Sequence, residues 1–92
     1  MISHIIHDGV IQRSWQMKNF LKSMICELVN TPQEVSVNEV VGQNTTIYEI
    51  ACRKEDIGKI IGKAGKTIEA IRLIMIAIAS KTQARINIEI LE

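Results

Sequence analysis

The sequence has few cysteines, no long apolar run and almost no net charge, and each shortage excludes a class of protein. Its two cysteines, Cys26 and Cys52, are not in CxxC spacing, so we expect buried thiols in a reduced compartment rather than a disulfide framework or a structural zinc site. The longest uninterrupted apolar stretch, residues 73–79, is seven residues long, far short of the ~20 that span a bilayer. The pattern of a secretion signal is also absent, which favours a cytoplasmic protein.

The chain has 92 residues, which is enough for one small domain and excludes large barrels and doubly wound sheets. Eleven Lys and Arg side chains against ten Asp and Glu give a net charge of +1, which alone predicts no attraction to nucleic acid or to anionic membranes. This total hides a division of charge. Residues 53–85 contain eight basic and three acidic side chains, whereas the rest of the chain contains three basic and seven acidic ones. The local balances are therefore +5 and −4.

Hydrophobic periodicity predicts six elements in the order α-β-β-α-α-β. We expect a first helix ended by Asn30-Thr31-Pro32, and the six elements at residues 17–30, 35–41, 45–53, 54–61, 66–80 and 84–91. This order predicts an α+β fold in which the helices pack on one face of a three-stranded sheet. Residues 1–16 lack clear periodicity, so we expect a flexible N-terminal appendage there and a single domain at 17–92.

Both histidines lie in the N-terminal segment. His4, His7 and Asp8 have the spacing H-x-x-H-D, but no further cysteine or histidine is placed to complete a metal site, so we expect no metal. No Ser/His/Asp, Cys/His or paired-carboxylate set is placed for acid–base or nucleophilic work. We therefore expect a protein that is not an enzyme and that uses no cofactor.

The segment Ile60-Ile61-Gly62-Lys63-Ala64-Gly65-Lys66-Thr67-Ile68 joins the two later helices. Two glycines three residues apart allow a tight turn with an accessible main chain, and the free N–H groups at the start of the next helix favour an anion there. Lys63 and Lys66 add positive charge. Gly65-Lys66-Thr67 looks like the end of a P-loop, but Ile60 stands where that motif requires its first glycine, and the segment follows a helix rather than a strand. A dinucleotide-binding GxGxxG fails at the same position.

This segment, in this order of elements, resembles the KH (K-homology) domain of the type II topology, in which a GxxG loop joins two helices. The resemblance extends over residues 17–92 to the family of small bacterial proteins made of a single KH domain. The motifs that carry it are Asn30-Thr31-Pro32-Gln33-Glu34-Val35, Asp56-Ile57-Gly58-Lys59 and Thr67-Ile68-Glu69-Ala70-Ile71-Arg72. Residues 1–16 depart from the family pattern, so nothing is implied for them.

The resemblance implies single-stranded RNA binding, with the GxxG loop clamping the backbone of about four nucleotides. Such a protein would be a small RNA chaperone or a post-transcriptional regulator. Apolar residues of the neighbouring helix and strand would line a groove for the bases, and the RNA-binding positions would be Lys59, Ile60, Ile61, Gly62, Lys63, Ala64, Gly65, Lys66 and Arg72. A chain with only 3% aromatic residues fits this mode better than a surface on which bases stack on exposed rings. The alternative is an adaptor with a KH fold that binds a protein partner through its helices.

Several of these positions have an ordinary structural alternative. Gly62 and Gly65 fit a helix C-cap and a packing contact with no ligand. Arg72 could pair with Glu69, three positions away on the same helix. The other basic residues of this region fit a solvated surface as well as an RNA contact; these are Arg53, Lys54, Lys81 and Arg85.

The helix at residues 66–80 is apolar nearly all round, although the domain has only one sheet to cover it. At 100° per residue, one face holds five apolar residues, namely Ile68, Ile71, Ile74, Met75 and Ile78. Leu73, Ile76 and Ala77 lie on the opposite side, and we expect them to form a dimer interface. The alternative is burial against the first helix. The partner would be a second copy or, as the resemblance implies, a larger KH protein of the Jag/KhpB type.

Overall fold

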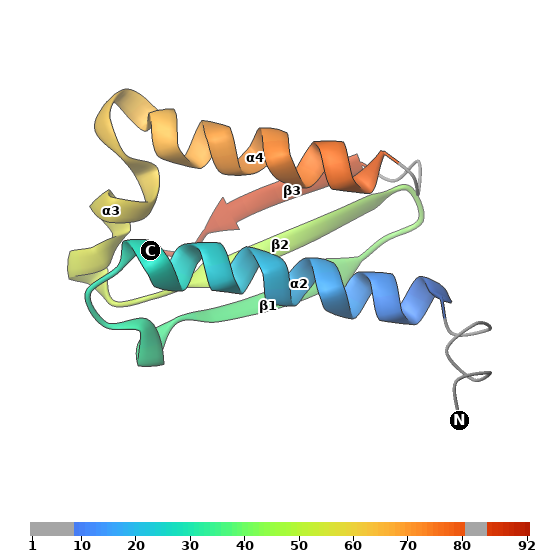
Figure 1. The fold of residues 1–92 in the computed structure, drawn as a ribbon, viewed down its shortest axis with the longest axis horizontal. Coiled ribbons are helices and arrows are strands. Elements are labelled where there is room, and N and C mark those ends of the chain that lie inside the picture. Colours follow the sequence, from blue (N-terminus) through green and yellow to red (C-terminus); the bar gives the residue numbers. More distant parts are fainter. Residues whose placement is uncertain (1–8, 81–84) are drawn as a thin grey trace.

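The structure is a computed structural model that describes residues 9–80 and 85–92, and within these ranges three strands form one mixed sheet (Figure 1). β1 (Ser36–Val41) and β2 (Thr45–Ala51) form an antiparallel hairpin. β3 (Arg85–Ile90) pairs in parallel with β2, so β2 is central and β3 is an edge strand. α2 (Gly9–Leu28) and α4 (Lys66–Ala79) lie side by side over the sheet, with the short α3 (Ile57–Ile61) at one end. The predicted α+β fold is confirmed.

The first helix begins earlier than its apolar pattern predicts. α2 starts at Gly9 rather than at Met17, so residues 9–16, interpreted as part of an appendage, are its first turns. Helical periodicity in a sequence is imposed by packing against a core, and among the described side chains of α2 the core begins at Met17. His4, His7 and Asp8 lie outside the described residues. No helix in residues 9–80 and 85–92 is long and apolar enough to cross a membrane.

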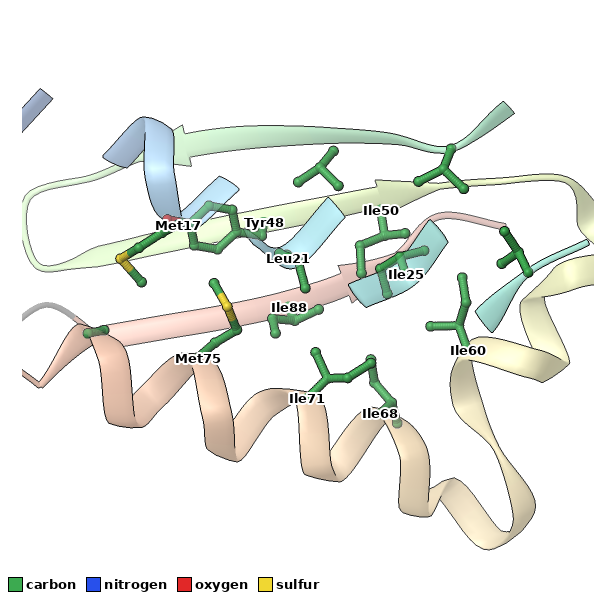
Figure 2. Packing of buried hydrophobic residues seen from close by; sticks show 14 residues of the cluster. Met17, Leu21, Ile25, Tyr48, Ile50, Ile60, Ile68, Ile71, Met75 and Ile88 are labelled. Atoms are coloured by element: carbon green, nitrogen blue, oxygen red, sulfur yellow. The ribbon is translucent and has the colours of Figure 1, made fainter. Parts of the chain in front are cut away.

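The core lies between the helices and the sheet (Figure 2). Leu21 and Ile25 of α2 and Met75 of α4 point into the space between the helices and the sheet, where Ile50 of β2 and Ile88 of β3 also lie. Spacings of three and four residues place the buried side chains of each helix on one stripe, as the periodicity predicts. The fully or nearly fully buried members are Met17, Leu21, Ile25, Val29, Val35, Val37, Tyr48, Ile50, Ile60, Ile68, Ile71, Met75, Ala79 and Ile88.

Of the two aromatic side chains that the structure describes, Tyr48 is buried and Phe20 is exposed, and the Tyr48 hydroxyl has a partner. It lies opposite Glu39 in the β1–β2 register and donates a hydrogen bond to Glu39 Oε2 at 2.8 Å. Burial of the phenol, followed by the hydrogen bond to the Glu39 carboxylate and by its charge, raises the pKa of Tyr48 well above its ordinary value. The pair satisfies a buried hydroxyl and favours the observed register of the hairpin.

One side of α4 is left uncovered by the rest of the described chain. Leu73 is 62% exposed and Ile76 is 48% exposed, so the alternative that they are buried against the first helix is wrong. Ile74, predicted on the core face, is 41% exposed because the buried stripe centres on Met75, and Ile74 lies about 100° away from it around the helix. Leu73, Ile74, Ile76 and Ala77 together form the outer face of α4.

The two cysteines are half-buried rather than buried as expected. Cys26 Sγ lies 3.8 Å from the Pro32 carbonyl oxygen, and Cys52 Sγ lies 3.4 Å from the Arg53 carbonyl oxygen. Burial, and next the charge of Asp56, raises the pKa of the Cys52 thiol. A raised pKa lowers the thiolate fraction at neutral pH, so Cys52 is poorly suited to nucleophilic chemistry.

Candidate nucleic-acid interface

The segment between α3 and α4, residues 62–65, is the glycine loop, and its backbone is mostly left-handed. Gly62 has φ 78° and ψ 173°, Ala64 has φ 57° and ψ 25°, and Gly65 has φ 74° and ψ 13°. The Gly62 N–H donates to the Gly58 carbonyl at 2.9 Å, and the Gly65 N–H donates to the Gly62 carbonyl at 3.1 Å. These bonds fix a reversal of the chain in a conformation that L side chains rarely adopt.

The two glycines are required for different reasons. A Cβ atom on Gly62 would overlap the Thr67 hydroxyl and lie 2.9 Å from the Thr67 backbone nitrogen. A Cβ atom on Gly65 would meet nothing within 4 Å, so that position needs glycine only for its left-handed backbone. The first turn of α4 therefore packs directly under Gly62. Sequence reasoning placed Thr67 in a motif but gave it no role, and its supporting position becomes visible only in three dimensions.

The glycine loop presents positive charge without bulk. Lys59, Lys63 and Lys66 are all exposed around it. The Lys66 N–H donates to the Lys63 carbonyl, and Gly65, at the N-cap of α4, offers no side chain to cap the N–H groups that follow in the first helical turn. Together with the positive end of the helix dipole, these groups make the loop favourable for a phosphate group.

A groove of about 500 Å³ lies beside the loop, between the end of α3, the first half of α4 and the edge strand β3. Its apolar wall comes from Ile61, Ile68, Ile88 and Ile90. Because β3 is an edge strand, alternate backbone N–H and C=O groups on its outer side take no part in the sheet. An apolar groove bordered by backbone groups that take no part in the sheet suits a flat heterocycle that carries hydrogen-bonding edges.

Arg72 crosses this groove. Its guanidinium donates to Glu69 Oε1 at 3.4 Å and to the Ile88 carbonyl oxygen at 3.4 Å, and it lines the groove with the residues above. The pairing with Glu69 is therefore present, and it does not remove Arg72 from the groove. Both distances are long for such bonds, and the side chain is 41% exposed, so these contacts are readily exchanged for others.

Two carboxylates at the groove were missed by sequence reasoning. Glu89 and Glu92 line it together with the isoleucines. Glu89 alternates with Ile88 and Ile90 along β3, and this alternation alone places it on the face opposite the isoleucines. Carboxylates repel phosphates but accept hydrogen bonds from the amino groups of bases. The site therefore has two parts. The cationic loop suits the phosphate backbone of a nucleic acid, and the polar and apolar wall of the groove suits base edges.

Not every predicted position can touch a ligand. Ile60 is fully buried in the core, so its assignment as an RNA-contacting residue is wrong; on the short α3 it faces inward and anchors the helix. Ile61 lines the groove. Arg53 is exposed and paired with Glu55 at 3.1 Å, as expected of a solvated surface. Lys81 lies outside the described residues, and Arg85 is exposed at a different hollow.

Asp56 is a buried carboxylate at the start of α3. It is 2% exposed and accepts a hydrogen bond from the Thr31 backbone N–H at 3.0 Å. This contact joins the turn after α2 to the helix that leads into the glycine loop. In the sequence, Asp56 is one of three acids in a basic region, and nothing in its spacing distinguishes it from a solvated residue.

Comparison with protein families matches residues 18–90 to the family described as KhpA/KhpB, KH domain. The chain is 50% identical over 76 residues to a protein of Chlamydia pneumoniae named RNA-binding protein KhpA. The aligned residues make up 83% of this chain and 97% of the relative. Proteins of the same name from Clostridium acetobutylicum and Borreliella burgdorferi are 41% and 38% identical. The alignment with the Clostridium protein covers 82% of this chain and 100% of that relative. The alignment with the Borreliella protein covers 78% of this chain and 88% of that relative.

Proposed function

The chain belongs to the KhpA/KhpB family of KH domains, and from that premise we propose that it binds single-stranded RNA at the glycine loop and the adjoining groove. The observation that carries the proposal is the backbone of residues 62–65, where three of four residues have positive φ and the main chain is open to a ligand. Beside this loop lie exposed lysines and the uncapped start of α4. These features favour a polyanion that is gripped through its backbone.

The two parts of the site have different tasks in this proposal. Lys59, Lys63 and Lys66 attract the phosphates over about four nucleotides, and the positive end of the α4 dipole favours them there. The Gly62, Gly65 and Lys66 N–H groups donate within the chain, so any direct amide contact comes from the other N–H groups of the loop and of the first turn of α4. The isoleucines of the groove pack against base faces, and the polar residues Arg72, Glu89 and Glu92 hydrogen-bond base edges. Because no described aromatic ring lines the groove, we expect moderate affinity and a loose sequence preference.

This mode of binding suits a small RNA chaperone or post-transcriptional regulator that acts in the cytoplasm, and not an enzyme. A chaperone needs contacts that form and break, which the long, half-exposed bonds of Arg72 provide. Within residues 9–80 and 85–92, no three His, Cys, Asp or Glu residues are grouped so as to hold a metal ion.

Fluorescence anisotropy of a short labelled single-stranded RNA across a salt series tests the proposal. We expect binding at low salt and a linear fall of log K with log salt concentration, with a slope of about −0.7 for each phosphate contacted. Binding that does not depend on salt would show that the loop is not holding phosphates. The absence of any binding at low salt would instead favour the adaptor function.

The outer face of α4 is the observation that favours a protein partner in addition to RNA. It is an apolar surface on an ordered helix, and the rest of the described chain does not cover it. We propose that Leu73, Ile76 and Ala77 form an interface with a second copy or with a larger KH protein of the Jag/KhpB type. The RNA groove meets α4 at Ile68 and Arg72. Leu73 and Ala77 lie about 100–140° from Arg72 around the helix, so a partner seated on these two residues leaves the groove accessible, whereas Ile76 lies on the same side of α4 as Arg72.

Leu73→Glu is expected to reduce the molar mass in solution from that of a dimer to that of a monomer, because a charge would be buried without a partner at the interface. Light scattering of the purified variant measures this, with circular dichroism to confirm the fold. Ser23→Glu, on an exposed position of α2, is the matched control and should keep the wild-type mass. A folded Leu73→Glu protein with the wild-type mass would contradict an interface between two copies of the chain.

A further inference from the structure

A second hollow, the distal hollow, follows the RNA groove along the same seam between α4 and β3. It has a volume of about 420 Å³ and is lined by Thr45, Ile76, Arg85, Ile86 and Asn87. Ile76 is one helical turn beyond Arg72, and Ile86 is two residues before Ile88 on the same side of β3. Each of these steps is about 6 Å, so a strand that leaves the groove along the seam enters the distal hollow next. Figure 1 shows α4 running beside β3 over this distance.

The chemistry of the distal hollow suits a nucleotide. Arg85 supplies an exposed guanidinium that forms no salt bridge with the described residues. Ile76, 48% exposed, and the half-buried Ile86 supply an apolar surface, while Asn87 and Thr45 supply an amide and a hydroxyl. None of the lining residues is acidic, in contrast to the groove with Glu89 and Glu92.

The lining residues are also held in place before any ligand arrives. Thr45 lies opposite Arg85 in the parallel register of β2 and β3. The Arg85 backbone N–H donates to the Asn44 carbonyl at 3.0 Å, which fixes the start of β3 against the hairpin. The cation and the two polar groups therefore project from paired strands, so little ordering is lost when a ligand binds.

We propose that the distal hollow is a further RNA subsite, which holds a nucleotide of the same strand beyond those bound at the glycine loop. Arg85 binds a phosphate, the base lies against Ile76 and Ile86, and Asn87 and Thr45 hydrogen-bond the base edge or the 2′-hydroxyl. This inference rests on the proposed RNA-binding function, and it increases the number of nucleotides that the chain contacts. It makes the length of the RNA, as well as its charge, a determinant of affinity.

The test compares a labelled tetracytidylate with an octacytidylate by anisotropy at constant salt. An octanucleotide can place any of several four-nucleotide stretches at the glycine loop, which raises its apparent affinity statistically. We expect the octanucleotide to bind the wild-type chain more tightly than this statistical gain explains. Arg85→Ala should weaken octanucleotide binding about tenfold, as for loss of one charged hydrogen bond, and leave tetranucleotide binding unchanged. Arg85→Lys, which keeps the charge, should retain most of the length effect. Arg53→Ala removes the same charge from an exposed site in the basic region and should leave the length effect intact.

An equal loss for both lengths in Arg85→Ala, or no loss for either, would overturn the subsite. If the wild-type chain binds neither oligonucleotide, the proposed function fails; if it binds both with no gain from length, only the subsite fails. Ile76 also belongs to the predicted dimer interface, so Ile76→Ser is measured by light scattering as well. A lower mass with unchanged octanucleotide affinity would assign the distal hollow to a protein partner and overturn the subsite.

Discussion

Replacing Lys63 and Ala64 together by aspartate is expected to abolish RNA binding while leaving the fold intact. The change introduces two negative charges and removes one positive charge at the proposed phosphate site, and like charges brought together in this way cost several kcal/mol. We expect a loss of about 100-fold or more in affinity. Both side chains are exposed, and Ala64 has φ 57°, a backbone conformation that aspartate adopts more readily than most residues.

Two matched variants separate the effect of negative charge at the loop from the effects of side-chain shape and of the protein's total charge. Lys63→Asn/Ala64→Asn has side chains of nearly the same size but no negative charge, and it should lose much less affinity than the aspartate pair. Lys22→Asp/Ser23→Asp makes the same change of charge on exposed positions of α2, away from the loop, and should bind nearly as the wild type does. If the α2 pair loses as much affinity as the loop pair, the effect is one of net charge and the loop is not the site.

Gly62→Ala is expected to be among the most destabilising single substitutions in the loop. The backbone at φ 78° and ψ 173° lies in a region that only glycine occupies readily, which costs about 1–3 kcal/mol for another residue. The added Cβ atom would also overlap the Thr67 side chain. Thr67→Ala cannot relieve this overlap, because the Thr67 Cβ atom and backbone nitrogen are also too close. We expect a loss of about 3 kcal/mol or more, from a total stability of about 5–14 kcal/mol for a chain of this length.

The free energy of unfolding in urea measures this loss, and two other glycines, Gly65 and Gly58, supply controls of graded severity in the same experiment. Gly65→Ala has the left-handed backbone but no steric neighbour, so it should cost about 1 kcal/mol. Gly58→Ala, within α3 and with nothing near its Cβ position, should stabilise the protein by about 0.5 kcal/mol. Equal stability of the Gly62→Ala and Gly65→Ala proteins would show that Thr67 does not pack under the loop as described.

The hydrophobic patterns of the helices and strands could be predicted from the sequence, because each pattern repeats within a single element. The alternation along β3 predicts its buried and exposed faces, and the spacing of Leu21 and Ile25 predicts the stripe of α2. The glycine pair Gly62 and Gly65 predicts the turn, because positive φ is a property of single residues. These signals require no knowledge of which elements are neighbours.

Features that depend on neighbours could not be predicted in this way. Glu89 lies at the groove only because β3 is an edge strand beside α4. Ile60 is buried because one turn of α3 faces the core, although it stands next to the loop in sequence. Asp56 is identified as a structural carboxylate only by Thr31, which is distant along the chain. The start of α2 was missed because its first turns lack the apolar spacing by which a helix is recognised.

RNA binding at the glycine loop is tested most directly by titrating the isotopically labelled protein with a short single-stranded RNA and following the backbone amide chemical shifts. If RNA binds there, the largest changes fall on residues 62–65, on the first turn of α4 and on Ile88, Glu89 and Ile90 of β3. Changes that fall on the outer face of α4, with the glycine loop unaffected, would contradict binding at the loop.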